Sequence, residues 1–161
     1  MANSPKILSA LSDLDTLCTA GYAMALHISY TTPRFLFQTY NRDWMDFYSK
    51  NGLVLKDPTV RWGFENTGTV MWQDLKDQDV DNVLGHAKSY GIKYGFTHSL
   101  DIGGSKSITS FARADRSFSE DEILRITQLA EDIHRASADF KEFSSEALDE
   151  LKRLSIEFTH N

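Results

Sequence analysis

Three aromatic side chains with polar tips occur at helical spacing in the first third of the sequence. Tyr40, Trp44 and Tyr48 stand at i, i+4 and i+8, so a helix that extends back to Tyr40 places them on one side. Asp57 and Trp72 follow downstream. Aromatic walls with a few polar groups are typical of a binding site for a partly apolar ligand that carries carbonyl and N–H groups.

The alternative is that these rings form an ordinary aromatic core stripe. Buried indole and phenol groups need hydrogen-bond partners, which a plain core does not supply. Asp57 stands before Pro58, a pair typical of a helix start, and its carboxylate is an acceptor close in sequence to the three rings. The combination favours a ligand site over a packing stripe.

The sequence predicts neither an enzyme nor a metal or cofactor site. No histidine pair has the spacing of metal ligands, and no serine stands in a Gly-x-Ser-x-Gly turn. The histidines are His27, His86, His98, His134 and His160. The segment 103–107 resembles a phosphate-binding loop only faintly, because Ser105 precedes the lysine, Leu100 replaces the first glycine and the segment joins two predicted strands.

Hydrophobic periodicity and turn residues predict the elements that position these side chains. We expect helices over 5–19, 42–50, 58–65 and 79–90, and two C-terminal helical stripes, one of Ile123 to Phe143 and one of Leu148 to Leu154. We expect strands over 22–30, 35–39, 70–72, 96–102 and 106–112. Two hairpins separated by helices indicate an α+β fold, a mostly antiparallel sheet of about five strands with helices on both faces.

Length, charge and cysteine content indicate the number of domains and the cellular compartment that we expect. The 161 residues suit a single domain over 1–161, and the single Cys18, expected in the core, indicates a reducing compartment. The net charge of −6 argues against direct DNA binding by this chain alone. The sequence shows no signal peptide and no membrane span, so we expect a cytoplasmic protein that does not bind membranes.

The segment YNRDWMDFYSKNGLVLKDPTV, followed by Trp72, resembles the autoinducer-binding domain of LuxR-type quorum-sensing regulators. YGIKYGFTHSL, with Gly95, and TSFAR, from Thr109, resemble later segments of the same family. The resemblance implies an α-β-α sandwich that encloses an N-acyl-homoserine lactone between its sheet and its helices. It also implies that the protein regulates transcription in bacteria. The resemblance further implies that the domain forms either a homodimer or a heterodimer with a related regulator.

The resemblance also implies a role for each site residue. Trp44 donates to the lactone carbonyl and Asp57 accepts from the ligand amide N–H. Tyr40 donates to the acyl carbonyl with help from Ser110. Thr59 makes a second contact to the head group. Tyr48 and Trp72 form the walls around the lactone ring. Leu26, Ile28 and Leu36 are candidates to line the acyl tail.

The sequence differs from the family pattern in two respects, and two other functions remain possible at this point. The family often has proline where Ser99 stands, and its members usually continue into a helix-turn-helix domain, which we do not expect within this chain. A stand-alone module that heterodimerises with a full-length LuxR-type regulator is the main alternative function. A PAS- or GAF-like sensor of another metabolite shares the architecture, but it does not account for the spacing of Trp44, Asp57 and Trp72.

Overall fold

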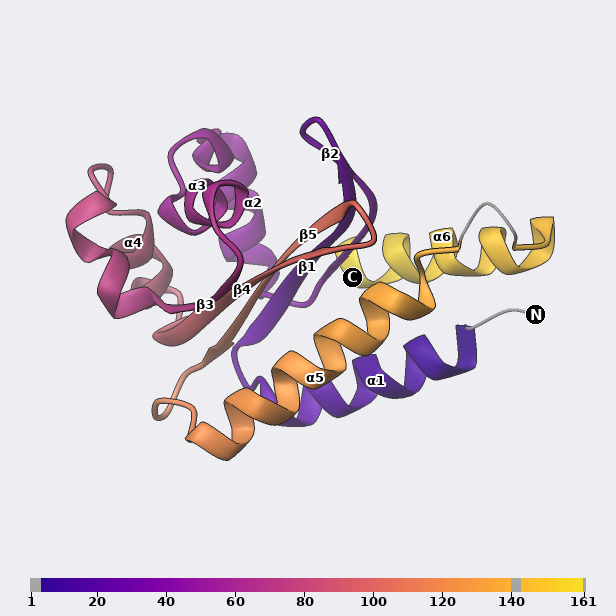
Figure 1. Cartoon of the computed structure of the whole chain (residues 1–161). Helices are drawn as coiled ribbons and strands as arrows, with labels where there is room; N and C mark the ends of the chain where they lie inside the picture. The colour runs from indigo at the N-terminus through magenta and orange to yellow at the C-terminus, as the bar shows by residue number, and fades with distance from the viewer. Residues whose placement is uncertain (1–3, 140–142, 161) are drawn as a thin grey trace.

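The computed structural model describes residues 4–139 and 143–160, with side chains over residues 5–139 and 143–153. Its centre is an antiparallel sheet of five strands in the order β2-β1-β5-β4-β3. The strands are β1 (Gly21–Ser29), β2 (Thr32–Gln38), β3 (Gly68–Met71), β4 (Tyr94–Ile102) and β5 (Ser105–Arg113). Helices lie on both sides of the sheet (Figure 1). The predicted α+β sandwich is confirmed.

One face of the sheet carries the main hydrophobic core. It packs against α1 (Ser4–Leu17), α5 (Glu120–Ala136) and α6 (Ser145–His160), and α1 and α5 lie side by side (Figure 1). From β1 this core takes Tyr22, Met24 and Leu26, which alternate along the strand. Successive strand residues point to opposite faces, so Ala23 and Ala25 lie on the other face.

The other face is covered by shorter elements. They are α2 (Arg42–Lys50), α3 (Pro58–Glu65), α4 (Val83–Ser89) and the 3₁₀ segments η1 (Leu53–Leu55) and η2 (Trp72–Gln78). A second, smaller cluster of buried side chains lies here, with Trp44 and Trp72 among its members. The helix start predicted at Asp57 and Pro58 is confirmed, because the Asp57 side chain accepts from the backbone N–H of Thr59. Asn41 caps α2 in the same way and accepts from the backbone N–H of Trp44.

Three predictions about the elements were wrong. The helix predicted from Asp79 begins at Val83, because the Asp79 carboxylate accepts from the N–H groups of Val83 and Leu84, 2.8 Å from each, and so caps the helix from outside it. Leu26 does not line the site face, since it belongs to the main core. The stripe predicted through Phe143 is interrupted after Ala136; Phe140 and the side chain of Leu154 lie outside the described residues.

Cys18 lies in the main core, as predicted, with 3% of its surface exposed. Burial raises the pKa of its thiol to about 12, so the reactive thiolate is absent at neutral pH. No described helix combines the length and the apolar character needed to cross a membrane.

Two histidines meet where β1, β5 and α5 converge. The rings of His27 and His134 lie 4.4 Å apart between centroids. Each ring has a nitrogen 2.7 Å from a serine hydroxyl oxygen, Nδ1 of His27 from Ser105 and Nδ1 of His134 from Ser107. Burial lowers the pKa of His27 to about 4 and also lowers the pKa of His134. Both rings are therefore neutral in the folded protein at neutral pH.

We predict that acid destabilises the fold through this pair. Between pH 6.5 and 4 the unfolded chain protonates His27 while the folded chain does not. The free energy of unfolding should therefore fall as pH falls, by up to about 1.4 kcal/mol per pH unit for this group. Urea unfolding at a series of pH values measures the slope.

His27→Asn is the matched variant, because His27 has a left-handed backbone (φ 54°) that asparagine tolerates. The variant should show a shallower loss of stability between pH 6.5 and 4. An identical slope in the two proteins would contradict the assignment.

Candidate ligand-binding site

The Asp57 carboxylate joins α2 to the start of α3. One oxygen, Oδ1, accepts from the backbone N–H of Thr59 at 2.8 Å and from the Thr59 hydroxyl at 2.7 Å. The other, Oδ2, accepts from the Tyr48 hydroxyl at 2.7 Å. A carboxylate oxygen accepts two hydrogen bonds, so Oδ2 has capacity for one more donor.

Burial governs the titration of this group and of the phenols around it. Burial raises the pKa of Asp57, and hydrogen bonds from Thr59, from Tyr48 and from the Val60 backbone N–H oppose the rise. Burial and the neighbouring Asp57 carboxylate raise the pKa of both Tyr48 and Tyr40. The two phenols therefore keep their protons and remain hydrogen-bond donors at neutral pH.

Trp44 forms the centre of the aromatic cluster on this face. Its ring is 5% exposed and lies edge-on to Tyr48 at 5.6 Å and against Tyr90 at 5.5 Å, between centroids. Tyr40 packs against the same cluster. Among the described residues, no hydrogen bond joins the Trp44 indole N–H or the Tyr40 hydroxyl to another group of the protein. Two donors are thus available near the Asp57 acceptor, since Tyr40 lies within electrostatic range of the carboxylate and Trp44 packs on Tyr48, which donates to it.

A polar chain runs across the sheet below these side chains. The Trp72 indole N–H donates to the Thr97 hydroxyl at 3.0 Å, and the Thr97 oxygen lies 2.7 Å from that of Ser110. The Trp72 ring lies flat against Gly95, where an added Cβ would come within 2.5 Å of it. Trp72 therefore contributes its ring surface here, since its only donor is already used.

The structure brings the seven predicted residues to one face of the sheet in two connected groups. Tyr48, Asp57 and Thr59 are hydrogen-bonded to one another. Tyr40 and Trp44 pack in the aromatic cluster that also holds Trp72. Ser110 joins through Thr97, opposite Ala23 of β1 in the strand register.

Sequence reasoning missed two members of this arrangement. Thr97 was overlooked, although its alternation with Phe96 and His98 marks it as facing the opposite side of β4 from the main core. Tyr90, which packs on Trp44, stands at the end of α4 and gave no periodic signal.

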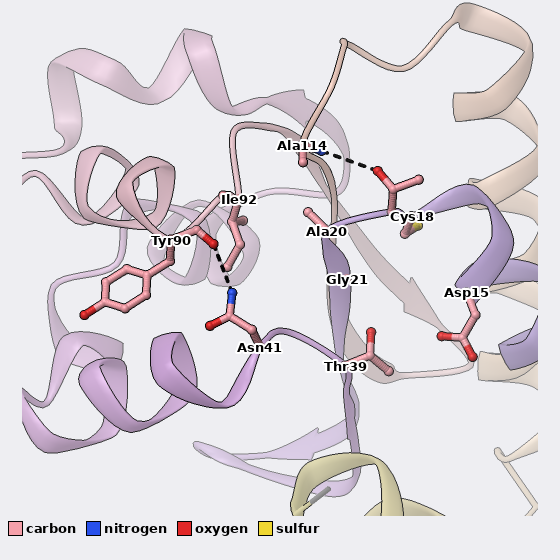
Figure 2. Close-up of a pocket in the computed structure, with 11 residues that line it drawn as sticks. Asp15, Cys18, Ala20, Gly21, Thr39, Asn41, Tyr90, Ile92 and Ala114 are labelled. Carbon is pink, nitrogen blue, oxygen red and sulfur yellow. Dashed lines mark hydrogen bonds between the residues drawn. The ribbon is translucent and has the colours of Figure 1, made fainter.

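A separate surface cavity of about 470 Å³ adjoins this cluster between the end of α1 and α4 (Figure 2). Asp15, Cys18 and Thr39 contribute to its walls, and Asn41 donates to the Tyr90 carbonyl at 3.0 Å on its other side. None of the seven predicted residues lines it. Across the described residues, no three or more His, Cys, Asp or Glu side chains are grouped so that they could hold a metal ion.

The profile of the family described as the autoinducer binding domain matches residues 9–137. Two similar sequences are the transcriptional activator protein SolR of Ralstonia nicotianae, 28% identical over 64 residues, and that of Ralstonia solanacearum, 29% identical over 82 residues. These matches cover 40% and 51% of this chain, and they span 27% and 34% of the relatives' lengths.

Solved structures agree on the fold. SdiA in complex with octanoyl-rac-glycerol superimposes with a TM-score of 0.65 and 17% identity, over 91% of this chain and 67% of that one. The N-acylhomoserine lactone dependent LuxR family transcription factor CepR2 of Burkholderia cenocepacia gives 0.59 and 16%, over 86% and 85%. The family is one of ligand-binding regulatory domains rather than enzymes. Because the profile match spans most of the sequence, this chain belongs to the family of autoinducer-binding domains of LuxR-type regulators.

Proposed function

We propose that this domain senses an N-acyl-homoserine lactone and that binding of this signal controls transcription. One observation carries the proposal. The Trp44 indole N–H and the Tyr40 hydroxyl are donors that make no hydrogen bond within the described residues. Both belong to the cluster around Tyr48, whose hydroxyl donates to the Asp57 carboxylate, and the Oδ2 atom of that carboxylate accepts no other side-chain hydrogen bond. An acylated homoserine lactone offers two carbonyl acceptors and one amide donor, which is the complementary set.

Each side chain then has one role. Trp44 donates to the lactone carbonyl, and the Oδ2 atom of Asp57 accepts from the amide N–H. Tyr40 donates to the acyl carbonyl, supported by Ser110. Thr59 holds Asp57 and adds a contact to the head group, while Tyr48 and Trp72 wall the lactone ring. The use of the Trp72 N–H by Thr97 supports a wall rather than a donor.

An acylglycerol is the competing ligand class, since the similar structure of SdiA contains octanoyl-rac-glycerol. An acylglycerol has no amide N–H, so it can donate to Asp57 only through a hydroxyl of its flexible glycerol head group. Holding that head group in one geometry costs conformational entropy, so we expect the more rigid lactone to bind more tightly.

Isothermal titration of octanoyl-homoserine lactone and octanoyl glycerol into the same protein tests this ranking. Both ligands have the same acyl chain, so their difference reports the head group alone. We expect the lactone to bind more tightly and to raise the melting temperature further, because only the folded state binds it. Equal or tighter binding of octanoyl glycerol would refute the proposed signal class.

The route from binding to transcription belongs to the same proposal. With a net charge of −6, this chain is poorly suited to bind DNA by itself. We expect residues 1–161 to act as one ligand-binding domain that passes the signal on through a homodimer or through a heterodimer with a related regulator. Sedimentation with and without lactone measures the association.

A further inference from the structure

A lysine on β5 binds the C-terminal end of α3, the helix that carries Asp57 at its start. The Lys106 ammonium donates to the carbonyls of Gly63 at 2.8 Å and of Asn66 at 2.9 Å. Its third contact is the Ser99 hydroxyl at 3.0 Å. An ammonium has three N–H donors, so all three are used. The last carbonyls of a helix lack partners within it and attract positive charge, which explains why a lysine is stable here.

Ser99 of β4 completes the contact. Its hydroxyl donates to the same Gly63 carbonyl at 2.7 Å, so two strands hold one turn of α3. Ile108 closes the remaining gap, because a Cβ added to Gly63 would lie 2.6 Å from an Ile108 methyl group. The helix backbone therefore lies directly on β5 at this end. We name Lys106, Ser99 and the Gly63 and Asn66 carbonyls the Lys106 clamp.

The clamp and the signal-binding carboxylate are at opposite ends of one short helix. α3 has eight residues, so Asp57 stands about 12 Å from the clamped turn. A tilt or slide of so short a helix at its C-terminal end moves its N-terminal end by a similar amount. The position of the Asp57 carboxylate relative to Tyr48 on α2 therefore depends on the clamped end.

We infer that Lys106 is a positioning residue for signal recognition, which fixes α3 on the sheet and thereby places the Asp57 carboxylate against the ligand amide. The inference rests on the proposed function for its ligand, but the clamp itself is a property of the unliganded protein. It also gives a role to Ser99, whose hydroxyl donates to the Gly63 carbonyl and accepts from Lys106.

Hydrogen exchange of the unliganded protein tests the clamp directly. In Lys106→Met, which keeps the aliphatic stem, the α3 amides should exchange about tenfold faster or more, while α5 amides remain as in the parent. Lys106→Arg should restore slow exchange, because a guanidinium also donates to carbonyls. Lys6→Met, at an exposed lysine of α1, is the matched control. Unchanged α3 exchange in Lys106→Met would overturn the inference.

A double-mutant cycle tests whether the clamp acts through Asp57. Lys106→Met should weaken binding of octanoyl-homoserine lactone about tenfold in the parent but less than about threefold in the Asp57→Asn background. Equal losses in both backgrounds would show a general structural role and overturn the inference. A parent protein that binds no lactone refutes the proposed function instead, and hydrogen exchange then decides the clamp alone. If Lys106→Met does not fold, Ser99→Ala, which removes one partner, takes its place in both measurements.

Discussion

Asp57→Asn is expected to weaken lactone binding by about tenfold or more while leaving the melting temperature of the unliganded protein nearly unchanged. Asparagine caps helices about as well as aspartate, so the bond to the Thr59 N–H persists. The variant also avoids the cost of a buried charge, which is reflected in the raised pKa of Asp57. The Tyr48 hydroxyl, which donates to Oδ2 of Asp57, can instead accept from the asparagine NH₂. What is lost is the charge-assisted bond to the ligand amide, and a tenfold loss corresponds to about 1.4 kcal/mol.

The chain offers a matched control for this substitution. Asp79 also caps a helix, α4, through two backbone hydrogen bonds of 2.8 Å, but it is not among the residues of the site. Asp79→Asn should lower stability modestly and leave the affinity for lactone at the parent value. Titration calorimetry of both variants separates the two effects. Equal affinity in Asp57→Asn and the parent would place the ligand elsewhere.

Trp44→Phe is expected to lower lactone affinity by a similar factor. Phenylalanine keeps an aromatic ring between Tyr48 and Tyr90 but removes the indole N–H, the donor proposed for the lactone carbonyl. Because that N–H makes no hydrogen bond within the described residues, its removal leaves no acceptor of the protein unpaired. The stability of the unliganded protein should therefore fall only slightly, because the variant loses only the packing contacts that the indole ring makes beyond those of a phenyl ring.

Thermal unfolding with and without octanoyl-homoserine lactone distinguishes the contribution of Trp44 to ligand binding from its contribution to the stability of the fold. The Trp44→Phe variant should lose most of the ligand-induced rise in melting temperature. Trp62→Phe, at a residue of α3 that lines a separate cavity of about 230 Å³, is the control and should keep the full rise. A Trp44→Phe protein that loses the same stability in both conditions would show that Trp44 only supports the fold.

Local signals in the sequence predicted the starts of the two helices that carry most of the candidate site. The cap at Asn41 and the pair of Asp57 and Pro58 define the starts of α2 and α3 by short-range hydrogen bonding, so both helices lie where they were predicted. The turn at Gly103 and Gly104 has left-handed backbone at both residues and joins β4 to β5, as the hairpin signal indicated.

Contacts between distant segments were not predictable in the same way. The bond from Trp72 to Thr97 depends on how η2 lies over β4, and the contact from Thr97 to Ser110 depends on strand register. The bonds of Lys106 to α3 join residues 40 and 43 positions apart. A register shift between Ala25 and Ile28 also interrupts the alternation along β1. No local pattern specifies these pairings, because each depends on the packing of the whole sheet.

The most direct test of lactone sensing is recovery of the signal from the protein itself. The chain is expressed beside an acyl-homoserine lactone synthase, purified, extracted with organic solvent and analysed by mass spectrometry. We expect the parent protein to yield close to one lactone per chain, and Asp57→Asn purified in parallel to yield much less. A well-folded parent protein from which no lactone is recovered would contradict the proposed function.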